Sequence, residues 1–360
     1  QVNFQRLIVL TDNPEEQAAA NFWVAKSLEK QGKQTDAVDY YNRAAQLDPT
    51  GYYSIRAQQL LTGAMPFSPP QNIDLGVDSE SEKIQGDRWM QNTFVLDASI
   101  NLAEVGDLIN YTTYQKAILH HKLGMTETAR GEFEALRTEL LGDAVNTYRL
   151  MNKLLDLGYY RSATLASRHI LDLAGLTETS NLTDPPVFFN HIRFGVFFHE
   201  YVYSAAVDRG LEPLVLFSII RQESLFESSI VSSAGARGVM QIMPATGDEI
   251  ALNMGWPVNY QTSDLNRPFI NITLGAQYYQ KWLAYFNGDH YAALASYNAG
   301  VGNAIAWMEL AGGDQDLFLA GEEEGLGQFA LQAYQCFDTV VQRRVRHQDD
   351  ELRATVAGQG

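Results

Sequence analysis

A glycine followed five residues later by an alanine recurs three times in the first half of the chain, and this repeat most constrains the fold. The copies begin at Gly32, Gly124 and Gly158. The last two lie 34 residues apart, which is the period of tetratricopeptide helix pairs. A glycine ends the first helix of each pair, and the small alanine lets the second helix approach closely. Because such pairs cannot bury their apolar faces alone, the sequence predicts a stacked, tetratricopeptide-like helical array.

The aromatic position of the repeat is occupied by Tyr41 in the first copy, by Phe133 in the second and by Ser167 in the third. Two stretches rich in proline and polar residues interrupt the helical pattern, which indicates linkers. The predicted organisation is a helical repeat segment over 1–61, a linker or loop over 62–90, a helical repeat domain over 91–185, a second kind of domain over 186–347, and a polar tail over 348–360.

Composition excludes several classes of function. Lys and Arg number 26 and Asp and Glu number 43, a net charge of −17, so the chain lacks the basic footprint of a nucleic-acid-binding protein. No stretch reaches the roughly 18 apolar residues of a membrane span. One cysteine and no metal or nucleotide motif indicate an absence of metals and cofactors. The chain starts at Gln1 without an apolar leader, so we expect that an export signal was removed or never existed.

A glutamate falls on the apolar face of a predicted helix. Pro213 suits the first position of this helix. Leu216, Ile219 and Ile220 then share one face, and Glu223 continues the same stripe. Burial there disfavours the charged carboxylate and raises its pKa, which is the condition that a general acid needs near neutral pH. The pattern makes Glu223 a candidate catalytic residue.

Two other interpretations of this region remain open. Glu223 could form a purely structural ion pair with Arg221 or another base. Glu227, four residues later, is the nearest candidate for a second catalytic carboxylate. A side chain at that helical spacing is more often part of a solvated face.

A glycine-containing segment follows the helix. Gly235 and Gly238 allow a tight turn where a ligand can lie against the backbone. Gln241 and Met243 alternate with apolar neighbours, so a short extended stretch would present both on one face. An amide and a thioether suit a sugar-binding wall. The alternative is a loop with a hydrophobic anchor, since methionine more often fills a core.

A third segment places Tyr297 and Asn298 directly before Gly300. The phenol could hydrogen-bond near a scissile oxygen, and the amide could fix the loop or a sugar substituent. The same four residues would also make an ordinary helix terminus.

These segments together resemble the soluble lytic transglycosylases, whose goose-lysozyme-like catalytic domain cleaves bacterial cell-wall glycan. The resemblance covers about 160 residues, and its motifs are 220–224, 235–244, 271–275 and 297–300. It implies a mainly α chain in which the helical array precedes an α+β lysozyme-like domain with a small β-hairpin. The array itself is similar to the superhelical and linker portions of the large family members.

The resemblance also assigns roles to single residues. Glu223 matches the family's single acid/base, and Ser224 matches the serine that helps to orient its carboxyl. The matching substrate-binding positions are Ser232, Gln241, Met243, Tyr297 and Asn298. One motif departs from the family, because Asp338 stands where a glutamate is usual and the tyrosine that follows has no equivalent.

The activity that the resemblance implies is lytic cleavage of the β-1,4 bond between N-acetylmuramic acid and N-acetylglucosamine, leaving a 1,6-anhydromuramoyl end and needing no metal or cofactor. The partners are then peptidoglycan glycan strands in the bacterial cell envelope, periplasmic or extracellular, with the array free to hold an envelope protein. The alternatives are a hydrolytic muramidase, which admits water instead of the sugar's own hydroxyl, and a non-catalytic helical scaffold.

Overall fold

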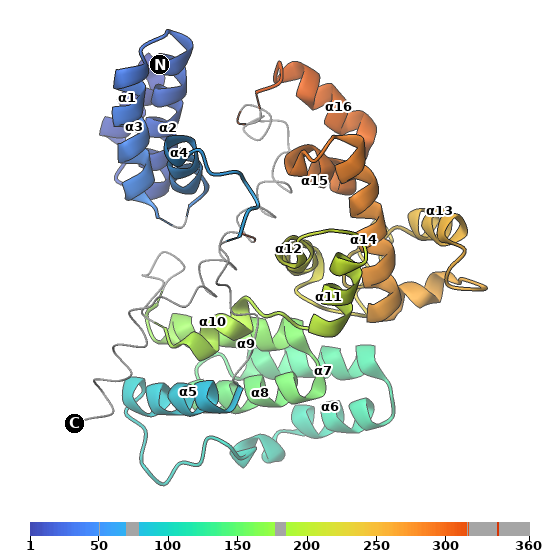
Figure 1. Ribbon diagram of the computed structural model, residues 1–360. Coiled ribbons are helices and arrows are strands. Elements are labelled where there is room, and N and C mark those ends of the chain that lie inside the picture. Colours follow the sequence, from blue (N-terminus) through green and yellow to red (C-terminus); the bar gives the residue numbers. More distant parts are fainter. Residues whose placement is uncertain (50, 70–78, 177–184, 315, 317–336, 338–360) are drawn as a thin grey trace. The chain divides into compact units, whose positions relative to one another are not determined.

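The structure is a computed structural model of the chain, and it describes residues 1–49, 51–69, 79–176, 185–314, 316 and 337 (Figure 1). Over these residues the regular elements are sixteen α-helices and two 3₁₀ helices. The predicted mainly α fold class is confirmed. Among the described helices, none is both long enough and apolar enough to cross a bilayer.

The chain divides into two compact units. The first comprises 1–71 and 285–341, and the second comprises 72–284 and 342–360. The helices of the first unit are α1 (Val2–Leu10), α2 (Pro14–Lys30), α3 (Gln34–Leu47), α4 (Tyr52–Thr62), α15 (His290–Ala299) and α16 (Val301–Leu310). The predicted domain boundary between 185 and 186 lies inside the second unit and stays a prediction.

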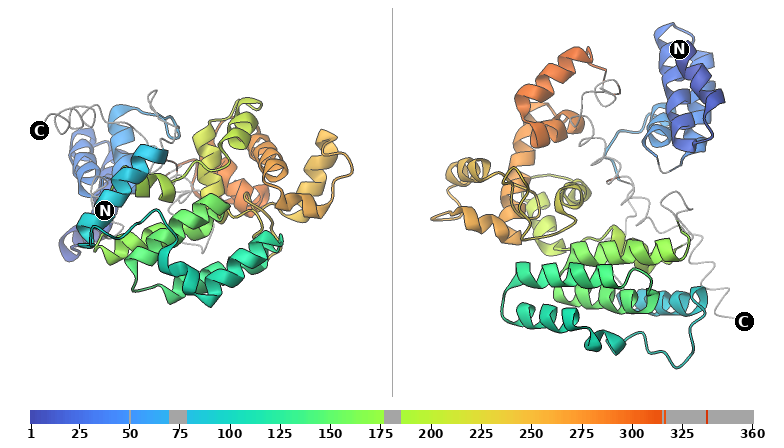
Figure 2. Two further views of the ribbon diagram at one scale, coloured as in Figure 1. Left: turned by 90° about the horizontal axis from the view of Figure 1, so that it is seen from below. Right: turned by 180° about the vertical axis from the view of Figure 1, so that it is seen from behind.

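The second unit holds the remaining elements. They are α5 (Ser79–Thr93), η1 (Gly106–Asn110), α6 (Thr112–Lys122), α7 (Thr126–Glu139), α8 (Ala144–Leu157), α9 (Tyr160–Leu173), α10 (Val187–Arg193), α11 (His199–Val207), α12 (Pro213–Ser224), α13 (Pro244–Met254), η2 (Thr262–Asn266) and α14 (Pro268–Tyr285). Helices α6 to α9 lie side by side in the views of Figures 1 and 2, and we call them the helical array.

The predicted repeat is present in both units. Each repeat glycine follows the first helix of a pair and has a φ between 72° and 79°, a conformation that favours glycine. The repeat alanines Ala37, Ala129 and Ala163 are completely buried. The pairs are α2 with α3, α6 with α7, and α8 with α9. Small residues at these positions let the paired helices pack closely.

The helical array ends at α9, whose repeat copy has Ser167 in place of an aromatic residue. Ser167 is completely buried on α9, and its hydroxyl donates a hydrogen bond to the carbonyl of Phe189 on α10 at 3.4 Å. The ring of Phe189 is also completely buried and belongs to the same hydrophobic core as α6 to α9. Helix α10 therefore closes the array, although the sequence places it in the following domain.

The predicted linker over 62–90 differs from the structure, because α5 begins within it. Glu80 and Glu82 lie in the first turn of α5, where negative charge stabilises the helix dipole. Met90 is completely buried. A Cβ atom added at Gly86 would lie 2.5 Å from Cδ1 of Phe188, so the glycine permits close packing on α10. The second predicted break lies mostly outside the described residues, as does the polar tail.

The predicted β-hairpin is reduced to two isolated antiparallel bridges in the described residues, Val231 with Arg237 and Arg237 with Ile242. The cause is a succession of tight turns. Gly235, Gly238 and Gln241 all have positive φ, so pairing does not continue beyond single residues and no strand forms there.

Candidate active site

Helix α12 places Glu223 as the sequence predicts. Pro213 occupies its first turn, and Leu216, Ile219 and Ile220 are completely buried. Glu223 follows them in the last turn, and its side chain is only partly exposed. The carboxyl group therefore lies at the edge of an apolar core, with access to solvent.

Burial raises the pKa of Glu223 from its ordinary value of 4.5 to about 8, because a charged carboxylate is poorly solvated there. No described residue forms an ion pair with it. The neighbouring Arg221 is committed elsewhere, since its Nε donates to the carbonyl of Arg193 at 2.9 Å and its guanidinium lies 4.5 Å from the ring centre of Phe194. The raised pKa favours the protonated form of Glu223 near neutral pH.

The chain reverses direction immediately after α12. Leu225 and Phe226 have φ of 52° and 65°, a left-handed conformation that costs about 1 kcal/mol or more for each non-glycine residue. Phe226 is almost completely buried, and its ring lies 5.3 Å from that of Phe197 and 6.4 Å from that of Phe217. Packing of this ring helps to hold the strained turn in place.

Ser224 joins the end of α12 to the next loop. Its buried hydroxyl is 2.8 Å from the carbonyl oxygen of Val239 and 3.1 Å from that of Ile220, both within donating distance. The resemblance implies that this serine orients the catalytic carboxyl. The hydroxyl contacts backbone rather than the Glu223 carboxyl, so its effect on Glu223 acts through the position of the helix end.

Ser232 and Gln241 hold the glycine-containing loop by hydrogen bonds to its backbone. The Ser232 hydroxyl accepts from the N–H of Ala236 at 3.0 Å. The Gln241 amide donates to the carbonyl of Gly238 at 2.8 Å and to that of Ile230 at 3.3 Å. Among the described residues, none donates a hydrogen bond to the Gln241 side-chain carbonyl oxygen.

The predicted alternation around Gln241 is present, although a turn replaces the expected extended stretch. Met240 and Ile242 are buried, whereas Gln241 is partly exposed and Met243 is 42% exposed. The side chain of Met243 is therefore accessible to solvent.

Asn271 has a role that sequence reasoning missed, since it entered only as part of a motif. The side chain is completely buried at the start of α14. Its Oδ1 accepts from the N–H of Met240 at 2.7 Å, and its Nδ2 lies 2.8 Å from the Arg237 carbonyl and 2.9 Å from the Leu265 carbonyl. The signal that could have found it is an amide placed directly between Ile270 and Ile272 at the apolar start of a helix.

Two glycines permit this close packing. A Cβ atom at Gly238 would lie 2.1 Å from the carbonyl oxygen of Leu265, and one at Gly275 would lie 2.4 Å from the sulfur of Met240. The loop that carries Gln241 and Met243 therefore sits directly on α14.

Tyr297 and Asn298 lie where the sequence places them, in the last turn of α15 before Gly300. Tyr297 is buried and Asn298 is exposed. Both belong to the first unit, whereas Glu223, Ser224, Ser232, Gln241 and Met243 belong to the second. Asp338 lies outside the described residues.

Glu227 is not part of a solvated face, contrary to the interpretation favoured by its spacing. Its side chain is only 4% exposed, because the left-handed residues before it turn the chain inward. The Ser229 hydroxyl donates to its Oε1 at 3.1 Å, and Oε2 is buried without a described partner. Burial raises the pKa of this carboxyl as well.

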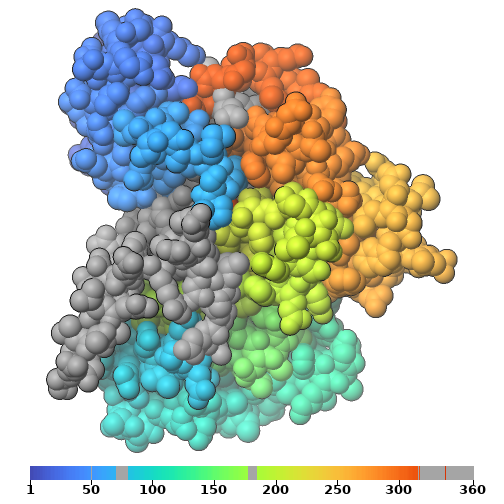
Figure 3. Space-filling view, in the orientation of Figure 1, coloured from blue at the N-terminus to red at the C-terminus, as the bar shows by residue number. Residues whose placement is uncertain are grey.

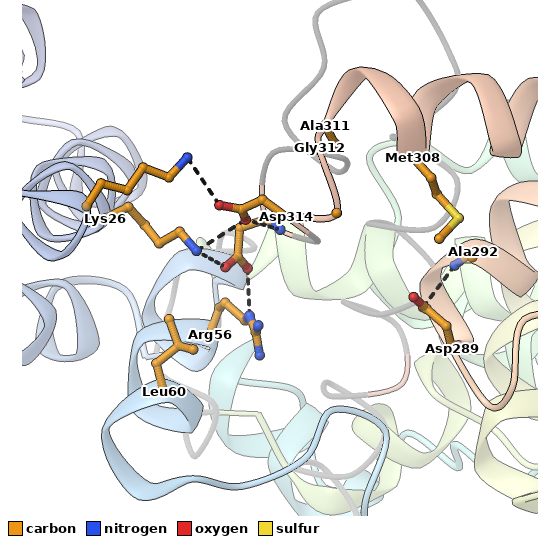
Figure 4. Close-up of a pocket in the computed structure, with 12 residues that line it drawn as sticks. Lys26, Arg56, Leu60, Asp289, Ala292, Met308, Ala311, Gly312 and Asp314 are labelled. Atoms are coloured by element: carbon orange, nitrogen blue, oxygen red, sulfur yellow. Dashed lines mark hydrogen bonds and ion pairs between the residues drawn. The ribbon is translucent and has the colours of Figure 1, made fainter.

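The first unit contains a pocket of about 700 Å³ between α2, α4, α15 and α16. Asp316 is almost completely buried there, and it accepts from Arg56 Nε at 2.7 Å and from Lys26 Nζ at 2.8 Å. Lys26 also contacts Asp314, as Figure 4 shows. Among the described residues that line the pocket, Asp314 and Asp316 are thus paired with Lys26 and Arg56. Among the described residues, no group of three or more His, Cys, Asp or Glu side chains is placed to hold a metal.

Comparison with known proteins points to one family. Residues 200–317 match the family described as the transglycosylase SLT domain. The soluble lytic murein transglycosylase of Salmonella typhimurium is 29% identical over 116 residues, which are 32% of this chain and 18% of that protein. The chain thus matches less than a fifth of this relative's length.

Two solved structures share the fold. Lytic transglycosylase Slt from Pseudomonas aeruginosa, in an inactive variant, has a TM-score of 0.61 at 22% identity, over 94% of this chain and 47% of that one. The 70 kDa soluble lytic transglycosylase from Escherichia coli has a TM-score of 0.63 at 18% identity, over 92% and 47%. Residues 200–317 are therefore similar to the transglycosylase SLT domain, and the chain shares the fold of these two soluble lytic transglycosylases.

Proposed function

We propose that this chain cleaves peptidoglycan as a lytic transglycosylase, with Glu223 as its single acid/base. The observation that carries the proposal is the Glu223 carboxyl, which is held protonated at the end of α12 by an apolar environment and has no described ion-pair partner. The name of the Salmonella typhimurium relative, a soluble lytic murein transglycosylase, supports the same activity.

In the proposed reaction, protonated Glu223 donates its proton to the glycosidic oxygen between N-acetylmuramic acid and N-acetylglucosamine. The bond from this oxygen to C1 of the muramoyl residue then breaks. The Glu223 carboxylate next removes the proton of the muramoyl C6 hydroxyl while the C6 oxygen bonds to C1. The products are a 1,6-anhydromuramoyl end and a free sugar hydroxyl, and Glu223 regains its proton. Neither water nor a cofactor enters the balance.

The remaining site residues divide by what they contact. Ser224, Ser232 and Gln241 hold the loop beside Glu223 through backbone hydrogen bonds, so we assign them to shaping the substrate wall. The exposed Met243 is proposed to contact a sugar face. Tyr297, Asn298 and Asp338 are proposed substrate contacts on the family pattern alone.

We also propose the bacterial cell envelope as the place of action, because the substrate is the cell wall. The net charge of −17 does not favour attraction to an acidic polymer. Recognition of the glycan strand then depends on shape and hydrogen bonding. An envelope protein held by the helical array remains part of the proposal.

The test is digestion of purified sacculi by the parent protein and by Glu223→Gln, with the released muropeptides measured by mass spectrometry. The parent should release muropeptides one water lighter than hydrolysis products, and the variant should be at least about 10²-fold slower. Glu249→Gln, at an exposed residue paired with Lys281, is the matched control and should retain parental activity.

Each contrary result has a distinct meaning. Products that retain the added water would identify a hydrolytic muramidase. A Glu223→Gln variant as active as the parent would exclude Glu223 as the acid/base.

A further inference from the structure

One tyrosine at the start of α9 contacts the segment that leads to Glu223. Tyr159, which precedes α9, belongs to the apolar core of the helical array, whereas its neighbour Tyr160 lies outside that core. The Tyr160 ring stacks on the ring of Phe197, between α10 and α11, with the ring centres 4.1 Å apart and the planes inclined by 9°. It also meets the ring of Phe198 edge-on at 5.2 Å. In Figure 3 the green surface of the array borders the yellow-green surface of the segment that includes α11 and α12.

The ring contacts continue from Phe197 to the turn that follows Glu223. The centre of the Phe197 ring lies 5.3 Å from that of Phe226, with the two planes nearly perpendicular. Such edge-to-face contacts are favourable between aromatic rings. The Phe226 ring lies 6.4 Å from that of Phe217, a completely buried residue of α12. A continuous row of ring contacts therefore joins the array to the helix that carries Glu223.

A glycine shows that the Phe197 ring has one place in this row. A Cβ atom added at Gly195 would lie 2.3 Å from Cε2 and 2.5 Å from Cζ of Phe197. The ring is packed between Tyr160 and Phe226, so it could not move aside without losing one of these contacts. The absence of a side chain at Gly195 therefore permits the row.

The turn after α12 needs support from its neighbours. It contains two consecutive left-handed residues, and such a conformation persists only where the surrounding structure enforces it. Two backbone hydrogen bonds close the turn, from the N–H of Leu225 to the Arg221 carbonyl at 3.0 Å and from the N–H of Glu227 to the Ser224 carbonyl at 3.2 Å. The first of these bonds spans Glu223. If the turn relaxed, the last turn of α12 would open and the Glu223 carboxyl would move.

We propose that Tyr160 of the helical array is a positioning residue for Glu223, because its ring holds Phe197 against Phe226 and so fixes the turn that ends α12. Its relevance to catalysis rests on the function proposed above for Glu223. Tyr160 acts through two other rings and the backbone of the turn, which distinguishes it from a catalytic residue.

The first experiment measures the turn directly, with no substrate present. Hydrogen–deuterium exchange of the full chain is followed by mass spectrometry of peptides that span residues 221–228. Tyr160→Ala should raise the exchange rate of these peptides at least about 10-fold, because the turn opens more often. Tyr160→Phe keeps the ring and should exchange as the parent does. Trp89→Leu is the matched control, since this partly buried ring packs within the array core on Phe189 at 5.0 Å; it should leave the turn protected.

The second experiment displaces Phe197 from the other side. Gly195→Ala should accelerate exchange of the same peptides about as much as Tyr160→Ala. Gly142→Ala is its control, because a Cβ atom added at Gly142 has no neighbour within 4 Å. The double variant Tyr160→Ala/Gly195→Ala should exceed either single variant by less than about 2-fold, since both changes act through the position of Phe197. Effects that multiply in the double variant would overturn the proposal.

Turnover of soluble glycan strands supplies the third measurement. Tyr160→Ala should lower kcat about 10-fold through misplacement of the acid, with KM changed less than about 2-fold, and Tyr160→Phe should retain parental kcat. Parental exchange or parental kcat in Tyr160→Ala would overturn the proposal. Should Tyr160→Ala fail to fold, Gly195→Ala decides it by the same two readouts. If exchange changes as expected but the parent releases no anhydro product, the proposed function fails while the support of the turn by Tyr160 stands.

Discussion

The helical array and the segment from Ser224 to Met243 belong to the same unit, yet they are held together by different interactions. The array depends on a continuous apolar core, with Ala129, Ala163 and Leu136 completely buried. The segment beside Glu223 depends on polar side chains, because Ser224, Ser232 and Gln241 each hydrogen-bond to backbone atoms of its turns.

This difference has a physical consequence. Apolar packing is not directional, so a truncated core residue lowers the free energy of unfolding while the helix positions persist. A side chain that pairs a buried carbonyl or N–H specifies one backbone conformation, and its loss leaves those groups unsatisfied. Substitutions in the array should therefore affect stability first, and substitutions around the loop should affect the geometry at Glu223.

The largest effect on stability is expected in the array. Leu136→Ala should lower the free energy of unfolding by about 3 kcal/mol, from lost burial and the cavity left behind. Urea denaturation measures it, and muropeptide release well below the unfolding midpoint should be unchanged per folded molecule. Leu119→Ala, at an exposed position of α6, should cost less than about 0.5 kcal/mol. A loss of activity in folded Leu136→Ala would contradict the separation of roles.

A smaller loss of stability with a larger loss of activity is expected at the loop. Asn271→Leu keeps the side-chain volume but removes the side-chain partner of the Met240 N–H and of the Leu265 carbonyl, at a cost of about 2 kcal/mol. Activity per folded molecule should fall at least about 10-fold as the loop shifts. Thr273→Ala on the same helix removes one exposed hydrogen bond and should change neither quantity appreciably. Full activity in Asn271→Leu would show that the loop is held by packing.

The same contrast explains what the sequence could predict. A repeat is visible because identical packing demands recur at a fixed period, so Gly124 and Gly158 identified the array before its helices were known. The burial of Glu223 was predictable for a similar reason, since it follows from helical spacing alone. Each inference needed only local regularity.

The features that escaped prediction depend on tertiary contacts. Leu225 and Phe226 adopt a left-handed conformation that non-glycine residues rarely take, so the inward turn that buries Glu227 has no signal in the sequence. The start of α5 inside the expected linker is stabilised by packing on α10. The roles of Tyr297, Asn298 and Asp338 rest on the family pattern and remain predictions.

The smallest expected effect concerns the pH dependence of stability, and it tests the electrostatics at Glu223 without any substrate. The folded protein raises the pKa of this carboxyl from 4.5 to about 8. A raised pKa means that the neutral form is favoured by folding, so the contribution is fully present below about pH 4.5 and is lost as the pH rises through about 8. Gln does not titrate and avoids this loss.

Glu223→Gln should therefore become more stable relative to the parent protein between about pH 4.5 and pH 9, by about 1–2 kcal/mol after allowance for the partial exposure of the side chain. Urea denaturation of both proteins across this range measures the difference, in which all other titrating groups cancel. For Glu249→Gln, at an exposed position, the difference in free energy of unfolding from the parent protein should hardly change with pH. If the difference for Glu223→Gln did not change with pH, the Glu223 carboxyl would already be ionised and solvated near neutral pH. The loop hydrogen bonds around it would then position a base and not an acid.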